Sequence, residues 1–345
     1  MTVLHLLWQL KRPRLAAHAR SRRRVQARQV VVSFLALVLM VNVVLSVGMD
    51  LFWPSLRDVE YTCRRDRLHA RVAADPGRPL AVALGSSRSD FGYRPLAVDS
   101  ETLVCNVSQV GAGPLIQLLT LRRLLHDGVR PQELFVEFWP PFLSGGSRSE
   151  LGRIDPHRLF PSDEPFVREY LPDPEATLAL MREIRRTPVW NHRQRIVSQT
   201  LSTWLPLERR IDGSRSRVDA AGWLPGPAMP QDLPTALKKS AEYYQPLFAE
   251  YALDPAAERA LREILATARS RSIRITLVWL PESSNFRSWY PPPVVQQAEA
   301  FMASLAGEGV KLINARDWLA DDVFPDGYHL TPEGAKAFTT RLLNR

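Results

Sequence analysis

The chain has 345 residues, which is enough for one large domain with an insertion or for two smaller domains. Hydrophobic residues make up 45% of it, so it can form a sizeable core, and global disorder is excluded. The formal net charge of +9 comes from residues 1–29, which hold eight Lys and Arg and no Asp or Glu. The remainder has 37 basic residues (45 less 8) against 36 acidic ones, so we expect no nucleic-acid-binding face.

An apolar stretch follows this basic tail, and residues 30–49 carry no formal charge. Twenty residues in a helix span about 30 Å, the thickness of the hydrocarbon layer of a bilayer. Phe52 and Trp53 fit an aromatic anchor at the membrane surface. We predict an uncleaved single-pass transmembrane helix. The alternative is a cleaved signal peptide, but its apolar region is usually shorter and no small-x-small cleavage site is obvious.

The distribution of positive charge predicts the orientation of this helix. By the positive-inside rule, residues 1–29 form a cytoplasmic tail at the cell (inner) membrane and everything after about residue 50 is extracytoplasmic. The charged residues 50–77 suit a stalk, and residues 78–345 form the main domain. Cys63 and Cys105 both lie on the exported side, where either a disulfide or two buried free thiols would be compatible with the sequence.

An Asp and a His three residues apart occur within the predicted stalk, at Asp66 and His69. The surrounding sequence has helical rather than loop character. We therefore interpret this pair as part of a solvated helix face.

From residue 78 onward, short apolar runs alternate with helical patterns. Continuous apolar runs bounded by turn residues are typical of buried parallel strands. The predicted strands are residues 80–84, 103–107, 134–138, 273–280 and 309–314, and the helices that follow or precede them are residues 115–125, 255–269, 294–305 and 332–343. This alternation predicts an α/β fold, a three-layer α/β/α sandwich with a five-stranded, mostly parallel, flavodoxin-like sheet.

Residues 144–254 interrupt this alternation and are predicted to be an insertion that carries a lid or a partner surface. The segment is rich in Arg, Pro and Ser, and helices are plausible at residues 175–186, 192–205 and 233–251. Its tryptophans could line a sugar-binding groove or belong to a local core; they are Trp190, Trp204 and Trp223.

Three features fall at the carboxyl ends of the predicted strands, where parallel sheets bind their ligands. They are the turn at residues 85–88 (Gly-Ser-Ser-Arg), the segment 106–111, and the loop with Asp326 and His329. A serine at a helix start has backbone N–H groups beside it that could stabilise an oxyanion. A carboxylate held against an imidazole could direct that imidazole at such a serine.

These residues resemble the motifs of the SGNH (GDSL-type) hydrolase superfamily, specifically its divergent membrane-anchored branch. That branch is similar to the D-alanyl-lipoteichoic acid biosynthesis proteins and to the acetyltransferase-like proteins of exopolysaccharide export. The resemblance implies that Ser87 is the nucleophile, that Asn106 and Gly111 form the second block with the Gly111 N–H as an oxyanion donor beside that of Ser87, and that Asp326 and His329 complete the triad.

The chain departs from the family pattern at the third block, which normally supplies an Asn after strand three. Glu137 occupies this region, and Arg88 is a candidate to compensate. Ser86 is a secondary candidate next to the nucleophile. Glu137 and Glu282 are isolated carboxylates, which we expect to be structural ligands of the site rather than an acid/base pair. No metal site and no cofactor are predicted.

The resemblance implies a serine esterase or O-acyltransferase that acts on cell-surface or exported polysaccharide through an acyl-serine intermediate. Transfer would require a partner that delivers acyl groups across the membrane, such as a multispanning membrane acyltransferase. The alternative is an inactive SGNH-fold protein that binds glycan or serves as a scaffold in an envelope polysaccharide assembly complex.

Overall fold

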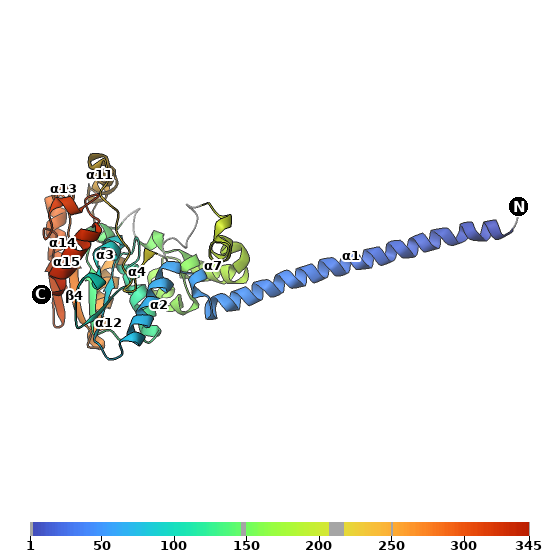
Figure 1. The fold of residues 1–345 in the computed structure, drawn as a ribbon, viewed down its shortest axis with the longest axis horizontal. Helices are drawn as coiled ribbons and strands as arrows, with labels where there is room; N and C mark the ends of the chain where they lie inside the picture. Colours follow the sequence, from blue (N-terminus) through green and yellow to red (C-terminus); the bar gives the residue numbers. More distant parts are fainter. Residues whose placement is uncertain (1–2, 146–149, 207–216, 250, 345) are drawn as a thin grey trace.

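A computed structural model describes residues 3–145, 150–206, 217–249 and 251–344, with side chains from residue 25 onward. It shows a long N-terminal helix that leads into an α/β domain (Figure 1). The strands are β1 (Leu80–Leu84), β2 (Leu103–Asn106), β3 (Glu133–Glu137), β4 (Arg274–Trp279) and β5 (Val310–Asn314). The helices are α1 (Val3–Leu51), α2 (Val59–Ala74), α3 (Ser87–Gly92), α4 (Pro114–His126), α5 (Pro140–Leu143), α6 (Glu164–Tyr170), α7 (Pro174–Arg186), α8 (Pro188–Asn191), α9 (Arg193–Thr200), α11 (Leu233–Ala249), α12 (Pro255–Ser270), α13 (Ser284–Ser288), α14 (Pro292–Ser304) and α15 (Pro332–Leu343).

The five strands form one parallel sheet in the order β2-β1-β3-β4-β5, which confirms the predicted fold class. The sheet grows outward in both directions from β1, so the β1/β3 boundary is a topological switch point. In such sheets the crevice at the carboxyl ends of the strands on either side of this point is the usual ligand site.

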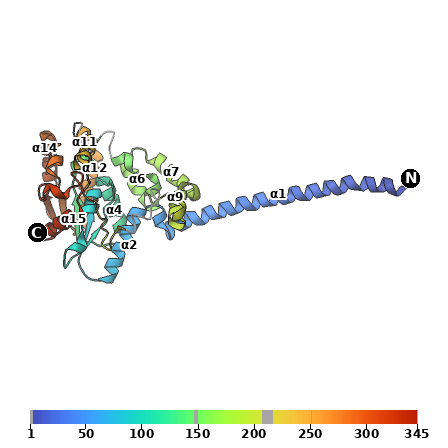
Figure 2. The ribbon, with the colours of Figure 1, turned by 45° about the horizontal axis from the view of Figure 1, so that its top comes forward.

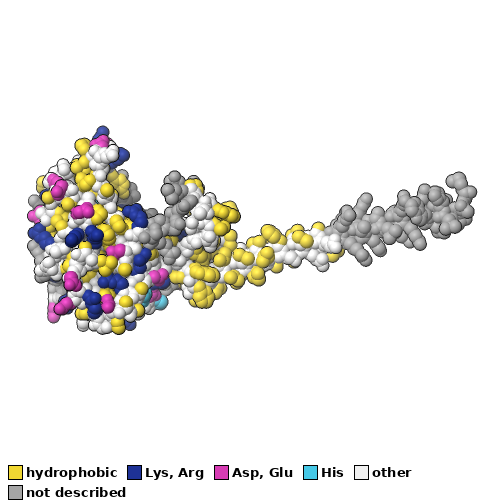
Figure 3. Space-filling view, in the orientation of Figure 1, with side chains coloured by type: hydrophobic (Ala, Val, Ile, Leu, Met, Phe, Trp, Pro, Cys, Tyr) yellow, Lys and Arg dark blue, Asp and Glu magenta, His cyan; other side chains and the backbone are white. Residues whose placement is uncertain are grey.

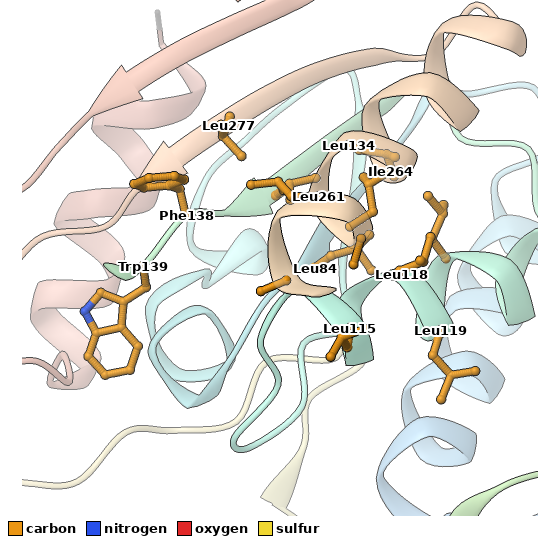
Figure 4. Close-up of a cluster of buried hydrophobic side chains, with 14 of the residues drawn as sticks. Leu84, Leu115, Leu118, Leu119, Leu134, Phe138, Trp139, Leu261, Ile264 and Leu277 are labelled. Atoms are coloured by element: carbon orange, nitrogen blue, oxygen red, sulfur yellow. The ribbon is translucent and has the colours of Figure 1, made fainter. Parts of the chain in front are cut away.

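Both faces of the sheet are buried, because successive side chains of a strand point to opposite sides. On one face, Leu84, Leu134 and Leu277 pack against Leu118 of α4 and Leu261 of α12 (Figure 4). On the other face, a second buried cluster joins the sheet to α15; it contains Ala83, Val104, Phe135, Val278, Ile313 and Phe338. Two apolar faces covered by helices give the three layers that the strand pattern predicted.

Helix α1 extends away from the domain (Figure 1, Figure 2). Within the described residues it is the one helix long and apolar enough to cross a membrane, over the 27 residues Val25–Leu51, and its apolar window is not buried by the rest of the protein. Composition of this kind also occurs in signal sequences. The basic side chains of residues 1–24 lie outside the described part.

Most of the segment predicted to be a stalk is packed helix rather than free chain. Helix α2 begins after Asp58, whose side chain accepts a hydrogen bond from the Tyr61 backbone N–H at 3.2 Å. Tyr61 and Leu68 belong to the larger core cluster. The apolar side chains of α2 are spaced at helical intervals, so one face is buried although the helix is rich in charge.

The two cysteines, Cys63 in α2 and Cys105 in β2, are both buried free thiols. Burial raises the pKa of Cys105 to about 11. Of the two alternatives compatible with the sequence, the structure therefore contains the free thiols.

The helices of the insertion 144–254 lie on opposite sides of the domain. Helices α7 and α8 contact the end of α1, whereas α11 lies on the far side of the domain (Figure 1). Among the three tryptophans, Trp223 is buried with 6% exposure, but Trp190 and Trp204 are 70% and 74% exposed. The local-core interpretation is confirmed for Trp223 and is wrong for the other two.

Candidate active site

The candidate nucleophile stands at the turn that follows β1. Gly85 makes this turn, and a Cβ atom there would meet Ser89 Oγ at 2.2 Å and Glu137 Oε2 at 2.5 Å, so only glycine fits. Ser86 is the N-cap of α3, because its Oγ accepts a hydrogen bond from the Arg88 N–H at 3.2 Å. Ser86 is fully buried, so Ser87, the first residue of α3, is the serine that the turn presents.

A continuous chain of hydrogen bonds joins Ser87, His329 and Asp326. Ser87 Oγ lies 2.8 Å from His329 Nε2, and His329 Nδ1 lies 2.7 Å from Asp326 Oδ2. Both distances are within the range found between the members of a Ser-His-Asp triad. The structure thus brings together residues that are 242 and 3 positions apart in the sequence.

Backbone hydrogen bonds fix the carboxylate of this group. Asp326 Oδ1 accepts from the backbone N–H of His329 at 2.9 Å and of Tyr328 at 3.2 Å. Burial alone would raise the pKa of Asp326, but the hydrogen bonds from the ring and backbone of His329 outweigh it and hold the pKa below its ordinary value. Asp326 is therefore an ionised group that can orient the imidazole and stabilise its protonated form.

Aromatic rings and a helix start hold His329 in place. Its ring lies 5.0 Å from the Phe91 ring and 4.2 Å from the Tyr328 ring, measured between centroids. Two residues later, Thr331 is the N-cap of α15, and its Oγ1 accepts from the Gly334 N–H at 3.2 Å. The loop that carries His329 therefore leads directly into a capped helix, which fixes the position of its C-terminal end.

Glu137, in the region where the family pattern has an Asn, lies beneath the nucleophile turn. Its Oε2 accepts from the Ser86 N–H at 2.5 Å and from Ser89 Oγ at 3.0 Å. Its side chain is only 1% exposed. Glu137 is thus a structural ligand of the turn, as expected, and does not replace the missing oxyanion donor.

The expectation that Arg88 compensates for the missing Asn is wrong. Its guanidinium is buried and donates to the carbonyl oxygens of Leu280 and Pro281 at 2.9 Å each and of Tyr328 at 3.3 Å. It also lies 4.5 Å from the centre of the Trp139 ring. These contacts direct the side chain of Arg88 into the protein, where it links the loops after β3, β4 and β5.

Glu282 is the second expected structural carboxylate, and its contacts agree with that role. Its Oε1 accepts from Trp139 Nε1 at 3.1 Å, Trp279 Nε1 at 3.2 Å and Tyr290 Oη at 2.8 Å. Arg88 Nη2 lies 3.5 Å from the same oxygen. A buried charge needs such partners, so Glu282 and Arg88 together stabilise the layer under the site.

Asn106 and Gly111, the second predicted block, have different environments. Asn106 Nδ2 donates to the carbonyl oxygens of Ser89, Asp90 and Tyr93 at 2.9 to 3.2 Å, so this side chain fixes α3. Gly111 lies two residues after Gln109. The Gln109 N–H donates to Gly85 O at 2.9 Å, and this bond places the segment that carries Gly111 beside the nucleophile turn.

The oxyanion role of Ser87 and Gly111 remains a prediction. Gly111 has a φ of +76° and open space where a side chain would stand. Among the described residues, neither the Ser87 nor the Gly111 backbone N–H donates to a protein acceptor. Both are therefore available to a developing negative charge.

Two buried carboxylates that fix the segments around the site were not predicted from the sequence. Glu150, from the insertion, accepts from the N–H groups of Gly113, Leu115 and Ile116 at 2.7, 2.8 and 3.0 Å, and burial raises its pKa to about 7. Asp90 of α3 pairs with Arg64 of α2 at 2.6 Å, and burial raises its pKa to about 6. Neither lies in a recognisable motif, because each partner is distant in the sequence.

Within the described residues, no group of three or more His, Cys, Asp and Glu could hold a metal ion. The chemistry that this arrangement can perform with its own side chains is proton transfer and nucleophilic attack by a serine.

No protein-family model matches the chain, and no curated protein matches it. A solved structure from Streptococcus pneumonia, provisionally described as a platelet activating factor, is similar to 92% of this chain and 98% of its own, with 13% identity and a TM-score of 0.40.

Proposed function

We propose that this protein is a membrane-anchored, extracytoplasmic serine esterase or O-acyltransferase of the SGNH type. The observation that carries the proposal is the hydrogen-bonded chain from Ser87 through His329 to Asp326, at the carboxyl edge of a parallel sheet. Ser86 and Glu137 fix the turn that presents the serine, and Thr331 fixes the loop that presents the histidine.

The geometry supports a double displacement. With Nδ1–H donating to Asp326, His329 Nε2 takes the proton of Ser87 Oγ as that oxygen bonds to the carbonyl carbon of an acyl ester. The carbonyl oxygen becomes an oxyanion, which the N–H groups of Ser87 and Gly111 stabilise. The C–O bond of the ester then breaks, the alcohol leaves with the proton from His329, and an acyl-serine remains.

The second half of the reaction returns the enzyme to its starting state. Water or a sugar hydroxyl loses a proton to His329 and attacks the carbonyl carbon of the acyl-serine. The bond between that carbon and Ser87 Oγ then breaks, His329 returns the proton to Ser87 Oγ, and the product is either an acid or a new ester. The missing third-block Asn leaves two backbone donors for the oxyanion. Loss of one oxyanion donor typically costs about 10²- to 10³-fold in rate, so a slow enzyme is expected.

The proposed substrate is a polysaccharide that is exported or held at the cell surface. Support comes from the motif resemblance, carried by Ser87, Asp326 and His329, and from the apolar helix Val25–Leu51, which is long enough for an anchor. We propose that this helix is not cleaved and that the domain faces away from the cytoplasm. A multispanning membrane acyltransferase would supply acyl groups if the reaction is transfer.

The second candidate is a catalytically inactive glycan-binding or scaffold protein with the same fold. Two observations favour it. Glu137, in the region of the missing Asn, is a carboxylate that accepts hydrogen bonds from the nucleophile turn, and the buried Arg88 donates to carbonyl oxygens inside the protein. In this case the triad would survive as a structural hydrogen-bond chain.

Acyl-ester turnover by the full-length protein separates the two candidates. We expect the parent to hydrolyse an activated acetyl ester and Ser87→Ala to lose this activity, while Ser288→Ala, a change at an exposed serine of α13, retains it. Transfer is tested by adding an acetyl-free polysaccharide and measuring ester formation on it. Equal turnover by the parent and Ser87→Ala would favour the scaffold.

A further inference from the structure

A groove lies between helix α7 of the insertion and the C-terminal part of α1, close to where α1 joins the domain. It has a volume of about 570 Å³. One wall consists of α1 residues that are mostly apolar, and the other of three α7 arginines; the lining residues are Leu39, Asn42, Val43, Ser46, Val47, Arg182, Arg185 and Arg186. An apolar wall opposite a cationic wall is the chemistry of a site for an amphiphile with a negative head.

An ion-pair cluster shows the level of this groove relative to the proposed membrane span. Asp50 is the first charged residue after the apolar stretch, so it marks the region of the lipid headgroups. Arg57 and Arg185 each lie 2.7 Å from a carboxylate oxygen of Asp50. Arg185 of α7 is thereby held at the headgroup level, and Arg182 and Arg186 line the groove beside it.

The sequence of α7 separates its two faces. Leu178, Met181 and Ile184 are buried in the insertion, whereas Arg182 and Arg186 are exposed. The apolar face of α7 therefore packs on the protein, and the face that carries the arginines is the one left open to the groove and to solvent. Long arginine side chains can rest their methylene groups on apolar surface and still place the guanidinium among phosphates.

Large apolar side chains are exposed on the elements that adjoin the same end of α1. Trp190 of α8 and Trp204, which follows α9, are 70% and 74% exposed, and Phe52 and Trp53 at the end of α1 are 72% and 51% exposed. Helix α8 contacts α1, and α9 contacts the 3-10 turn Pro54–Leu56. Figure 3 shows hydrophobic side chains continuing from α1 onto the adjoining part of the domain. Exposed tryptophans are characteristic of the membrane–water interface.

We propose that residues 174–204 form a second membrane contact that docks on the bilayer surface beside α1, with the headgroup of an anionic phospholipid bound in the groove. The phosphate pairs with Arg182 and Arg186, an acyl chain lies along Val43 and Val47, and Trp190 and Trp204 enter the interface. The inference rests on the proposed membrane anchoring. Such a contact would restrict rotation of the domain about α1 and fix the orientation of the Ser87 site to the membrane.

The test uses full-length protein in nanodiscs whose lipids carry bromine near the glycerol end of the acyl chain, which quenches nearby tryptophan fluorescence. The signal of interest is the quenching that is lost in Trp190→Ser/Trp204→Ser. We expect this signal in discs that contain phosphatidylglycerol, and a much smaller one in phosphatidylcholine alone. Arg182→Gln/Arg186→Gln should weaken the docking equilibrium by about fivefold for each arginine removed.

Matched controls separate docking from general effects of charge. Lys239→Gln/Lys336→Gln removes the same number of exposed charges from α11 and α15, which lie far from α1 in Figure 1, and should leave the quenching unchanged. Inorganic phosphate, compared with chloride at equal ionic strength, should not reduce the quenching. Competition by inorganic phosphate would mean that the groove takes a free anion, and it would overturn the lipid assignment.

Flotation of the same protein on a density gradient separates this inference from the anchoring proposal. If the protein floats with lipid but the parent and Trp190→Ser/Trp204→Ser are quenched equally, the second contact does not exist, and the anchor is unaffected. If the protein does not float, both fail. Docking that is independent of phosphatidylglycerol would also contradict the proposal.

Discussion

The chain contains two Asp-x-x-His sequences with opposite environments. Asp66 and His69 lie on α2, where Asp66 pairs with the neighbouring Arg65 at 2.7 Å and His69 is exposed. Asp326 and His329 lie on a loop, where Asp326 accepts two backbone N–H bonds and the ring of His329. The spacing is the same, but only the loop bends the chain so that the carboxylate meets the imidazole.

The contrast extends to what surrounds each pair. His329 has Ser87 Oγ at 2.8 Å and the Phe91 ring at 5.0 Å, and both come from α3, far away in the sequence. Asp66 is 53% exposed and is surrounded mainly by solvent. A carboxylate and an imidazole therefore become a candidate site through the partners that the sheet edge brings to them.

The largest difference is expected when each histidine is removed. His329→Ala should lower ester turnover by about 10⁴-fold or more, because within the described residues His329 is the base that is hydrogen-bonded to Ser87 Oγ. His69→Ala should leave turnover within about twofold of the parent, since an exposed helix residue contributes little. Initial rates of the two purified variants test this, and a similar loss in both would mean that the loop is not special.

The second largest difference is expected when the carboxylate of each Asp-x-x-His pair is replaced by an amide. Asp326→Asn keeps the size of the side chain but removes the charge and favours the wrong imidazole tautomer, so we expect a loss of about 10⁴-fold in kcat with little change in KM. Asp66→Asn is the matched change on α2 and should have no effect on either constant. Full activity of Asp326→Asn would argue that the hydrogen bond to His329 Nδ1 is structural.

The next prediction concerns the stability of the buried layer beneath Ser87, to which Glu137 belongs. Glu137→Ala leaves the Ser86 N–H and Ser89 hydroxyl without their acceptor, and we expect the free energy of unfolding to fall by about 3 to 5 kcal/mol. Glu299→Ala, at an exposed position of α14, should change it by no more than about 0.5 kcal/mol. Chemical denaturation in detergent measures both, and equal stability of the two variants would contradict the buried role.

Glu150 should give the smallest effect, and it depends on pH. Its pKa is raised from 4.5 to about 7, so between these pH values the folded state holds a proton that the unfolded state releases. The free energy of unfolding should therefore fall as pH rises from about 4.5 to about 7, by up to roughly 3 kcal/mol. Glu150→Gln should flatten this part of the profile in thermal denaturation; an unchanged slope would exclude Glu150 as its source.

Much of the fold was predictable because it depends on local composition. The apolar runs at 80–84 and 134–138 became β1 and β3 almost unchanged, since buried parallel strands are marked by continuous hydrophobic sequence. The juxtaposition of Ser87, Asp326 and His329 was predictable because each follows a strand or precedes a helix, and parallel strands bring their carboxyl ends to one edge; their catalytic role stays a prediction.

The remaining features depend on contacts that no local pattern encodes. Arg88 was expected near the substrate, but three carbonyl oxygens from two distant loops hold it inside the protein. Glu150 comes from the insertion, and its partners are backbone N–H groups at the start of α4, which leave no side-chain signature in the sequence. Trp190 and Trp204 are exposed, whereas Trp223 of the same insertion is buried, and the composition of the insertion does not encode this difference.

The central claim is that Ser87 is an activated nucleophile, and the most direct measurement is covalent labelling with a fluorophosphonate probe. Full-length protein is incubated with the probe, and the modified residue is located by peptide mass spectrometry. The account predicts one modification, at Ser87, which is lost in Ser87→Ala and on heat denaturation and strongly reduced in His329→Ala. Absence of labelling in the folded parent, or equal labelling in the folded and denatured protein, would contradict it.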